Sequence, residues 1–232
     1  KIFFFMNYLV CDKQLFMQQN FYISVIVPTF NTQKYIGRCL RSLKNQSLSK
    51  KNYEIIVIDD CSSDHSLDEI QKQKTSNIKI IKNKSNLGLP ASLNIGIKNA
   101  KGSFVVRVDS DDWVQEDFLN ILSTFLYLNK NLDAVSSDYS INDNNENLIR
   151  EENSEKQPIG CAIMFRMQHL LSINLYDEKF LYAEEEALRK AFLKKYKITR
   201  LPVSLYRYRQ HETNRSKNSK LVKKYSKKVG LK

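Results

Sequence analysis

The chain has 232 residues, of which 42% are hydrophobic, and it carries a formal net charge of +12 at pH 7. This length and composition favour one large domain, or one domain with a small appendage, that buries a sizeable core. The longest apolar stretch, over residues 2–10, is too short and too interrupted by polar residues to cross a bilayer, which argues against an integral membrane protein. The positive charge favours anionic partners: nucleotides, phospholipid surfaces or nucleic acid.

Four cysteines stand at positions 11, 39, 61 and 161. They show no paired spacing, and no histidine lies near enough in the sequence to suggest a zinc site. We therefore expect reduced thiols in a cytoplasmic protein.

The first half of the chain alternates predicted strands with predicted helices. β-branched runs predict strands, and apolar residues at helical spacing predict helices between them. The strands are expected over 23–28, 53–58, 78–81 and 103–108, and the helices over 36–43, after 62–64 and over 93–100. This alternation is typical of βαβ units, so we expect an α/β fold with a parallel sheet. No G-x-G-x-x-G follows the first strand, which argues against a dinucleotide-binding site.

The second half of the chain is less regular. We expect an amphipathic helix over 118–125, strands over 134–137 and 159–166, and a mobile polar loop over 142–156. Further elements are predicted as a helix from 184 to 192, short strands over 198–201 and 203–208, and a basic helix over 217–228.

Carboxylates follow two of the predicted strands. Asp109, Asp111 and Asp112 come directly after the run 103–108, and Asp59-Asp60 end the second strand. Ligands of open α/β sheets bind at the carboxyl ends of the strands, so both groups are expected to line one crevice. Close carboxylates repel one another unless a cation lies between them, and Asp-x-Asp suits Mg²⁺ or Mn²⁺. The alternative is a solvated turn in which an Asp caps a helix.

Taken in order, these segments resemble the family 2 glycosyltransferases, which have the GT-A nucleotide-sugar-binding fold. The resemblance covers about residues 23–216 and rests on ISVIVPTFN, YEIIVIDDCSSD, NLGLPASLNIGIKNAKG, VRVDSDDW and LYRYRQH. It implies a Rossmann-like, mostly parallel sheet flanked by helices, with a mixed acceptor-side half. The implied division is an extension over 1–22, a nucleotide-sugar-binding half over 23–113, an acceptor half over 114–216 and a basic tail over 217–232.

The resemblance also implies roles for residues at the nucleotide and the metal. The Pro28-Thr29 turn would pack beside the base, and Asp60 would bind the edge of the base. Asp111 would bind the divalent metal, Mn or Mg, and Asp109 would contact the ribose or the metal shell. Asn86, in the matching NLGLP turn, is a further candidate nucleotide contact, and Arg209 and His211 are candidate pyrophosphate contacts. Leu93 stands where many members have an arginine, so a phosphate contact from that position is absent.

The catalytic base is expected in an acidic pair. The family pair is usually Glu-Asp with the Asp as base, and this chain has Glu184-Glu185 instead. We favour Glu185 and keep Glu184 as the alternative, and a solvated helix start stabilised by the macrodipole is the structural explanation to exclude.

The function implied is transfer of a sugar from a nucleotide diphosphate sugar to a glycan or lipid-linked acceptor, with inversion. A catalytically degenerate nucleotide- or glycan-binding module is the alternative, because Glu replaces the family Asp. A phosphatase fits poorly, since its Asp-x-Asp would follow the first strand and not the fourth. Only the positive charge suggests a nucleic-acid partner, so we expect no specific nucleic acid. The C-terminal residues 207–232, with ten Lys or Arg against one acidic residue, are expected to be a solvated face or a peripheral contact with the anionic inner face of the membrane.

Overall fold

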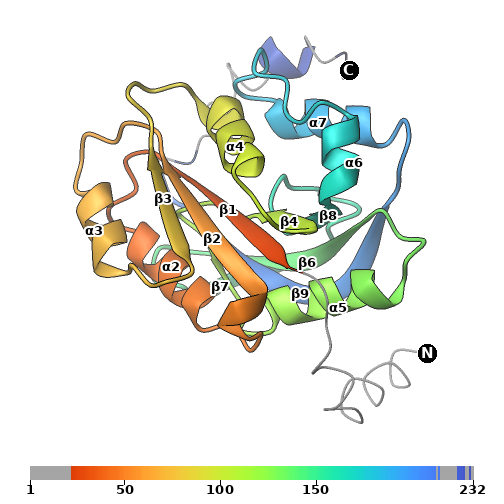
Figure 1. The fold of residues 1–232 in the computed structure, drawn as a ribbon, viewed down its shortest axis with the longest axis horizontal. Coiled ribbons are helices and arrows are strands. Elements are labelled where there is room, and N and C mark those ends of the chain that lie inside the picture. Colours follow the sequence, from red (N-terminus) through yellow and green to blue (C-terminus); the bar gives the residue numbers. More distant parts are fainter. Residues whose placement is uncertain (1–21, 213, 215–223, 228–229, 231–232) are drawn as a thin grey trace.

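The computed structural model describes residues 22–212, 214, 224–227 and 230, and these residues form a nine-stranded sheet with helices on both of its faces (Figure 1). The strand order is β3-β2-β1-β4-β8-β6-β9-β5, and β7 pairs with β6 beside this path. The expected α/β architecture is thus confirmed.

The first half of the sheet is parallel throughout. It contains β1 (Ile23–Thr29), β2 (Tyr53–Asp59), β3 (Ile78–Lys82) and β4 (Phe104–Arg107). All four strands were predicted from their β-branched runs. Their carboxyl ends meet at one edge of the sheet, which is where the predicted acidic groups stand.

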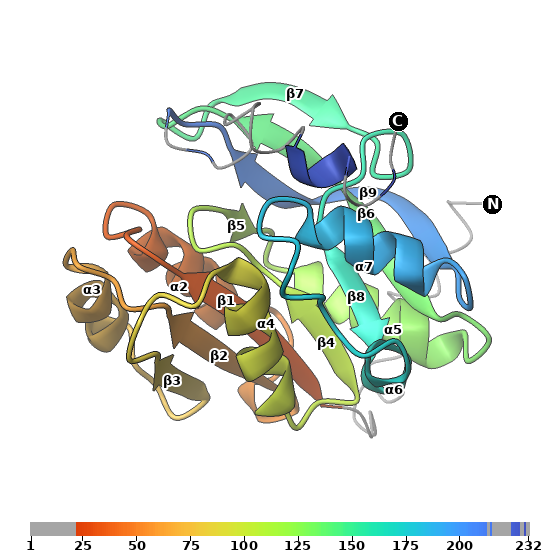
Figure 2. The same cartoon turned by 90° about the horizontal axis from the view of Figure 1, so that it is seen from above.

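The second half is mixed. β8 (Ile163–Arg166) runs antiparallel to β4, β6 (Ala134–Asn142) runs antiparallel to β8, and β9 (Ile198–Arg209) runs parallel to β6. β5 (Trp113–Val114) and β7 (Leu148–Glu152) add to β9 and β6. β9 therefore brings the C-terminal part of the chain back to the residues that follow β4, as Figure 2 shows from above.

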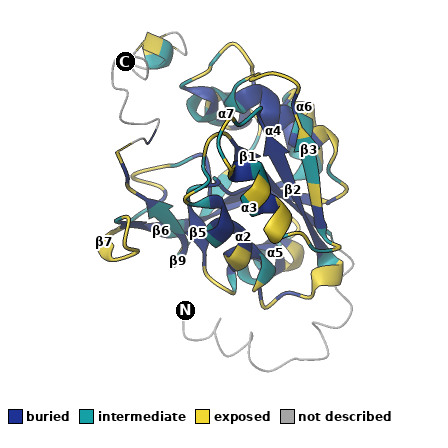
Figure 3. Ribbon diagram, turned by 90° about the vertical axis from the view of Figure 1, so that its left-hand side faces the viewer, coloured by how far each residue is buried: buried dark blue, intermediate teal, exposed yellow. Residues whose placement is uncertain are grey.

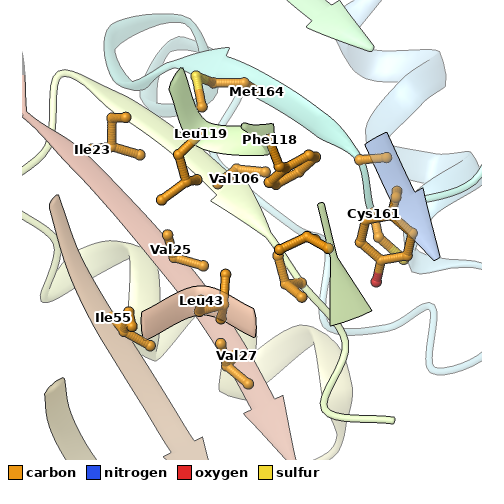
Figure 4. Close-up of a cluster of buried hydrophobic side chains, with 14 of the residues drawn as sticks. Ile23, Val25, Val27, Leu43, Ile55, Val106, Phe118, Leu119, Cys161 and Met164 are labelled. Atoms are coloured by element: carbon orange, nitrogen blue, oxygen red, sulfur yellow. The ribbon is translucent and has the colours of Figure 1, made fainter. Parts of the chain in front are cut away.

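Two buried clusters hold the helices on the sheet. In β1, Val25 and Val27 belong to the cluster under α2 (Ile36–Lys44) and α5 (Phe118–Leu128), whereas Ile26 belongs to the cluster under α4 (Leu89–Lys98). This division follows from the alternation of side chains along a strand. Figure 4 shows the first cluster, in which Leu43 and Phe118 from the two helices lie with Val25 and Val27. The remaining helices are α3 (Ser66–Lys72), α6 (Met167–Ser172), α7 (Glu184–Phe192) and the short 3₁₀ helix η2 (Lys50–Asn52).

Helix α4 packs unusually close to the sheet. A Cβ atom at Gly96 would lie 2.6 Å from Ile58 and 2.7 Å from Ile26. Glycine at this position therefore allows α4 to approach β1 and β2, and so fixes the turn before α4 against the carboxyl end of β2.

Several boundaries in the second half differ from the predictions. The segment 142–156 was expected to be a loop but contains β7, an edge strand whose residues are mostly exposed (Figure 3). Because both of its faces meet solvent, it lacks the alternation that marks a strand. The predicted strand over 159–166 begins only at Ile163, since Ala162 has φ 61°, and the two strands over 198–208 form one irregular strand, β9. α6 and β5 were not predicted.

The tail and the cysteines are described only in part. Most of the predicted helix over 217–228 lies outside the described residues, although residues 224–227 are helical. Cys39, Cys61 and Cys161 are free thiols, as expected, and Cys11 lies outside the described residues. Among the described residues, no helix has both the length and the apolar character needed to span a membrane.

Candidate active site

The acidic loop after β4 is a tight turn that leads into β5. The N–H of Asp112 donates to the carbonyl of Asp109 at 3.0 Å, which closes the turn. Asp109 and Asp111 are partly exposed, while Asp112 is 1% exposed. The three carboxylates therefore have different surroundings, and each has a different partner.

Asp112 joins the loop to β9. Its Oδ2 accepts the hydroxyl hydrogen of Tyr206 at 2.6 Å, and its Oδ1 accepts the backbone N–H of Arg209 at 2.7 Å. Burial raises the pKa of Asp112 well above its usual range, and the neighbouring Asp111 and Asp109 charges add to this shift. The Tyr206 oxygen also accepts the N–H of Asp109 at 3.1 Å. Neither Asp112 nor Tyr206 was predicted as a site residue, and both position the loop.

Asp109 is paired with a buried arginine. Nε and Nη2 of Arg107 lie 2.6 and 3.0 Å from the two carboxylate oxygens of Asp109, and Nη1 lies 3.4 Å from Oε1 of Glu184. Burial lowers the pKa of Arg107, but the charges of Asp109, Cys161 and Glu184 outweigh it and raise the pKa above its usual value. Arg107 therefore connects the acidic loop to the acidic start of α7. The sequence carried one signal of this role, a charged residue inside a buried β-branched run.

Asp111 faces a histidine from the end of β9. Its Oδ2 lies 2.9 Å from Nε2 of His211, and the two side chains are 24% and 5% exposed. The ring of Tyr35 packs against the His211 ring with centroids 4.7 Å apart. The predicted metal residue and the predicted pyrophosphate residue thus lie side by side.

Arg209 is enclosed by this group. Its Nε donates to the carbonyl of Asp111 at 2.9 Å and its Nη1 to the carbonyl of Asn144 at 3.0 Å. Its guanidinium lies 4.4 Å from the ring centroid of Trp113 and 5.2 Å from that of Tyr35. Because Arg209 is 3% exposed, the structure places it beneath the acidic loop as a support, and a direct pyrophosphate contact would require these bonds to break.

At the carboxyl end of β2, the two aspartates have different partners. Asp60 accepts from the amide of Asn83 and from the N–H groups of Leu87 and Gly88, each at 2.8 Å, so both of its oxygens hold the turn before α4. Asp59 is completely buried, and among the described residues its Oδ2 has no hydrogen-bond partner. Its role was not predicted.

The predicted residues around Asp59 and Asp60 lie at the same edge. Thr29 pairs with Asp59 in the sheet register, and its buried Oγ1 also lacks a partner among the described residues. Pro28 is buried beside it, and Asn86 is exposed on the turn that Asp60 holds. Two buried oxygens without a hydrogen-bond partner among the described residues, Oγ1 of Thr29 and Oδ2 of Asp59, therefore lie at the carboxyl ends of β1 and β2.

The acidic pair begins α7. Glu184 is 6% exposed and faces Arg107, whereas Glu185 is partly exposed and lies against Gly160. Burial raises the pKa of Glu185 from 4.5 to about 7, and the Glu184 charge contributes. A carboxyl group with this pKa exchanges protons near neutral pH. A solvated helix start, the structural alternative, does not describe Glu184, which is buried against Arg107.

Two groups of side chains are candidates for holding a divalent ion. Asp109, Asp112 and Cys161 bring ligand atoms within 4.8 Å of one another. However, Asp109 is already neutralised by Arg107, and the Cys161 thiol donates to Asp109 at 3.2 Å, with its pKa raised by burial and by the Asp109 charge. Asp111 and His211 form the second group, and their oxygen and nitrogen ligands suit Mn²⁺.

The described residues also line a polar pocket of about 290 Å³ between the segment after β1 and residues 144 and 212. Tyr35, which packs on His211, belongs to its lining. Asp59, Asp109 and Asp111 are not part of that lining, so we place the candidate active site at the strand ends instead.

Comparison with known protein families decides the identity of this fold. The family model described as Glycosyl transferase family 2 matches residues 24–195, which is most of the chain. The chain belongs to glycosyl transferase family 2. The resemblance of its motifs to that family is thereby confirmed.

The relatives that the chain matches include two transferases named for poly(ribitol phosphate). The chain is 40% identical over 105 residues to the poly(ribitol-phosphate) beta-N-acetylglucosaminyltransferase TarS of Staphylococcus aureus, a match that covers 44% of this chain and 18% of that protein. It is 34% identical over 163 residues to the poly(ribitol-phosphate) beta-glucosyltransferase of Bacillus spizizenii, covering 67% of this chain and 26% of that protein. The matches thus span only a minor part of these relatives.

Solved structures of other glycosyltransferases confirm the GT-A fold. A fragment of S. aureus TarS in complex with UDP-GlcNAc superposes with a TM-score of 0.72 at 26% identity, covering 85% of this chain and 61% of that one. The mannosyltransferase PcManGT of Pyrobaculum calidifontis, in complex with GDP-Man and Mn²⁺, superposes with a TM-score of 0.68 at 16% identity, covering 85% and 59%.

Proposed function

We propose that the chain transfers a sugar from a nucleotide diphosphate sugar to a hydroxyl of a glycan or lipid-linked acceptor, with inversion at the anomeric carbon. The observation that carries the proposal is the bridge formed by Arg107, which joins Asp109 in the acidic loop to Glu184 beside Glu185. Through it, the acidic loop that carries Asp109 and Asp111 would share one site with Glu185, a group able to accept a proton.

The nucleotide is proposed to bind at the carboxyl ends of β1 and β2. The buried, unpaired oxygens of Thr29 and Asp59 support this, because unsatisfied buried polar atoms are rare and indicate a missing partner. Pro28 would pack beside the base, and Asp60 would act by holding the turn that carries Asn86. Asp109 would face the ribose or the sugar.

A divalent ion, Mn²⁺ or Mg²⁺, would be held by Asp111 and His211. Their ligand atoms lie 2.9 Å apart at the mouth of the site, and a carboxylate with an imidazole is a suitable pair of ligands. When bound, such an ion neutralises the negative charge that develops on the departing diphosphate.

Glu185 is the proposed general base. The acceptor oxygen forms a bond to the anomeric carbon while the bond from that carbon to the phosphate oxygen breaks and its electron pair leaves with the diphosphate. The hydroxyl proton passes to the Glu185 carboxylate, whose pKa of about 7 suits a base at neutral pH. A single displacement of this kind inverts the configuration, since retention by double displacement requires a second carboxylate as nucleophile.

The matched relatives suggest the first substrates to test. Their names specify poly(ribitol phosphate) as acceptor and glucose or N-acetylglucosamine as the transferred sugar. We therefore propose a UDP-linked hexose or N-acetylhexosamine as donor and a polyol phosphate polymer or a related glycan as acceptor.

The test is release of UDP from UDP-GlcNAc and UDP-glucose, in the presence of Mn²⁺, with and without poly(ribitol phosphate). Acceptor-dependent release is expected, and Glu185→Gln should lower it about 10²–10⁴-fold while UDP affinity changes little. Glu186→Gln, which changes the next residue of the same helix, is the matched control and should retain activity. Tight UDP binding without any turnover, across a panel of glycan acceptors, would support the degenerate binding module instead.

A further inference from the structure

Gly160 lies in the segment between β7 and β8 and is buried against the start of α7. A Cβ atom added to Gly160 would lie 2.5 Å from Oε2 of Glu185, 2.9 Å from Cβ of Glu185 and 3.0 Å from Nη1 of Arg107. Distances this short are well inside van der Waals contact. The space that a side chain at position 160 would fill is therefore occupied by the Glu185 carboxylate.

The requirement for glycine here concerns space and not backbone conformation. The positive-φ glycines of the described residues are Gly88 and Gly230, so the backbone of Gly160 is one that alanine can adopt. An alanine at position 160 would thus test the volume beside Glu185 without straining the chain.

The segment around Gly160 is held in place against α7. Arg189, one helical turn after Glu185, donates from Nη2 to the carbonyl of Ile159 at 3.2 Å. Arg107 is fixed from the other side by its two contacts with Asp109. Because both neighbours are anchored, a methyl group at position 160 would displace the end of the Glu185 side chain.

We propose that Gly160 is a positioning residue that sets where the Glu185 carboxylate lies. This inference rests on the proposed role of Glu185 as the base. Glutamate is one methylene longer than aspartate, and the missing side chain at position 160 provides the room that the longer side chain occupies. The size of the side chain at position 160 therefore limits the length of the side chain that position 185 can hold.

A double-mutant cycle of Gly160→Ala and Glu185→Asp tests the pair. A displacement of the base of about 1 Å is expected to lower kcat by about 10²-fold in Gly160→Ala, with donor KM little changed. Glu185→Asp keeps the Cβ atom 2.9 Å from the added methyl group but draws the carboxylate back by one methylene from its 2.5 Å contact, so adding Gly160→Ala to Glu185→Asp should cost about tenfold less than it does in the wild-type protein. Fold losses that simply multiply would overturn the proposal.

Folding is followed in the same variants by thermal unfolding. If Gly160→Ala alone fails to fold, we expect Gly160→Ala/Glu185→Gly to fold, since both the Cβ and the carboxylate of residue 185 are then absent. Failure of both would place the crowding elsewhere and contradict the proposal. Gly37→Ala is the control, because a Cβ there would lie 3.3 Å or more from its neighbours, and it should retain activity and stability.

The outcome is separable from that of the proposed function. Full activity of Glu185→Gln would show that Glu185 is not the base, whatever Gly160 does. An inactive Glu185→Gln together with an unimpaired Gly160→Ala would leave the base assignment intact and remove only the role of Gly160.

Discussion

Nε2 of His211 lies 2.9 Å from Oδ2 of Asp111, although one hundred residues separate them in the chain. Asp111 follows β4, and His211 follows β9 at the far end of the second half of the sheet. The antiparallel pairing of β5 with β9 brings them together, with Trp113 opposite Arg207. The second half of the sheet therefore brings His211 to the acidic loop that follows β4.

The pH dependence of transfer should follow Glu185. Its pKa is raised to about 7, so the carboxylate is a competent base only above that pH, and kcat/KM should rise with pH through about 7. The rate is measured at saturating Mn²⁺, with UDP binding recorded at each pH, so that loss of metal or donor is recognised. A rate that stays constant from about pH 5.5 to about pH 8.5 would argue against Glu185 as the titrating base.

The raised pKa of Glu185 predicts that stability falls with pH where the transfer rate rises. Between pH 4.5 and about 7, the folded state retains a proton on Glu185 that the unfolded state has released. The contribution of this group to the free energy of unfolding therefore falls as pH rises through that interval. Urea unfolding of the wild type and of Glu185→Gln at several pH values measures this contribution. The free energy of unfolding of the wild type, relative to that of Glu185→Gln, should fall as pH rises. A difference in the free energy of unfolding that does not change with pH would contradict the raised pKa of Glu185.

Glu184→Gln should affect stability more than chemistry. Glu184 is 6% exposed and faces the Arg107 guanidinium, so loss of its charge should lower the free energy of unfolding by about 1–3 kcal/mol. Transfer should fall much less than in Glu185→Gln. If Glu184→Gln is inactive and Glu185→Gln turns over normally, the base is Glu184 and the assignment is wrong by one residue.

Tyr206→Phe should loosen the acidic loop. The Tyr206 hydroxyl donates to Asp112 and accepts the N–H of Asp109, and removing it leaves both buried groups with one partner fewer. A loss of about 1–3 kcal/mol in the free energy of unfolding is expected, with weaker metal-dependent UDP binding. Tyr53→Phe, which removes a buried hydroxyl that donates to the carbonyl of Leu43 far from the loop, is the control for binding and should leave it unchanged. If Tyr206→Phe binds UDP as tightly as Tyr53→Phe and the wild type do, Tyr206 does not position the loop.

The basic tail should bind anionic surfaces without contributing to donor binding. Residues 217–232 contain seven lysines and no acidic residue, and each basic residue near an anionic bilayer contributes about 1 kcal/mol. Truncation after residue 216 should abolish sedimentation with phosphatidylserine vesicles and leave UDP affinity unchanged. Sedimentation of the truncated chain equal to that of the full chain would exclude the tail as the contact.

The parallel half of the fold was predictable because its strands are rich in β-branched residues, and β1, β2 and β4 are buried on both faces. The second half was less so: β7 is exposed on both faces, and β5 and α6 are too short to show a period. Local spacing also predicted Asp109 and Asp111 at a strand end, and the family resemblance pointed to the pair at 184–185. It did not assign the contacts of Arg107, Tyr206 and Asp112, since these depend on β9 and α7 returning to the loop after β4, nor the division of partners between Asp59 and Asp60.

We propose that Asp111 and His211 together hold the divalent ion that binds the diphosphate. The most direct test is calorimetric titration of UDP into the wild type, Asp111→Asn and His211→Gln, each with Mn²⁺ and with EDTA. His65 and Asp68 form a second His–Asp pair, 3.0 Å apart but exposed on the surface, and Asp68→Asn is the matched control. We expect both site variants to stay folded and to lose the Mn²⁺-dependent part of UDP binding, while Asp68→Asn retains it. Mn²⁺-dependent binding in Asp111→Asn equal to that of the wild type would contradict it.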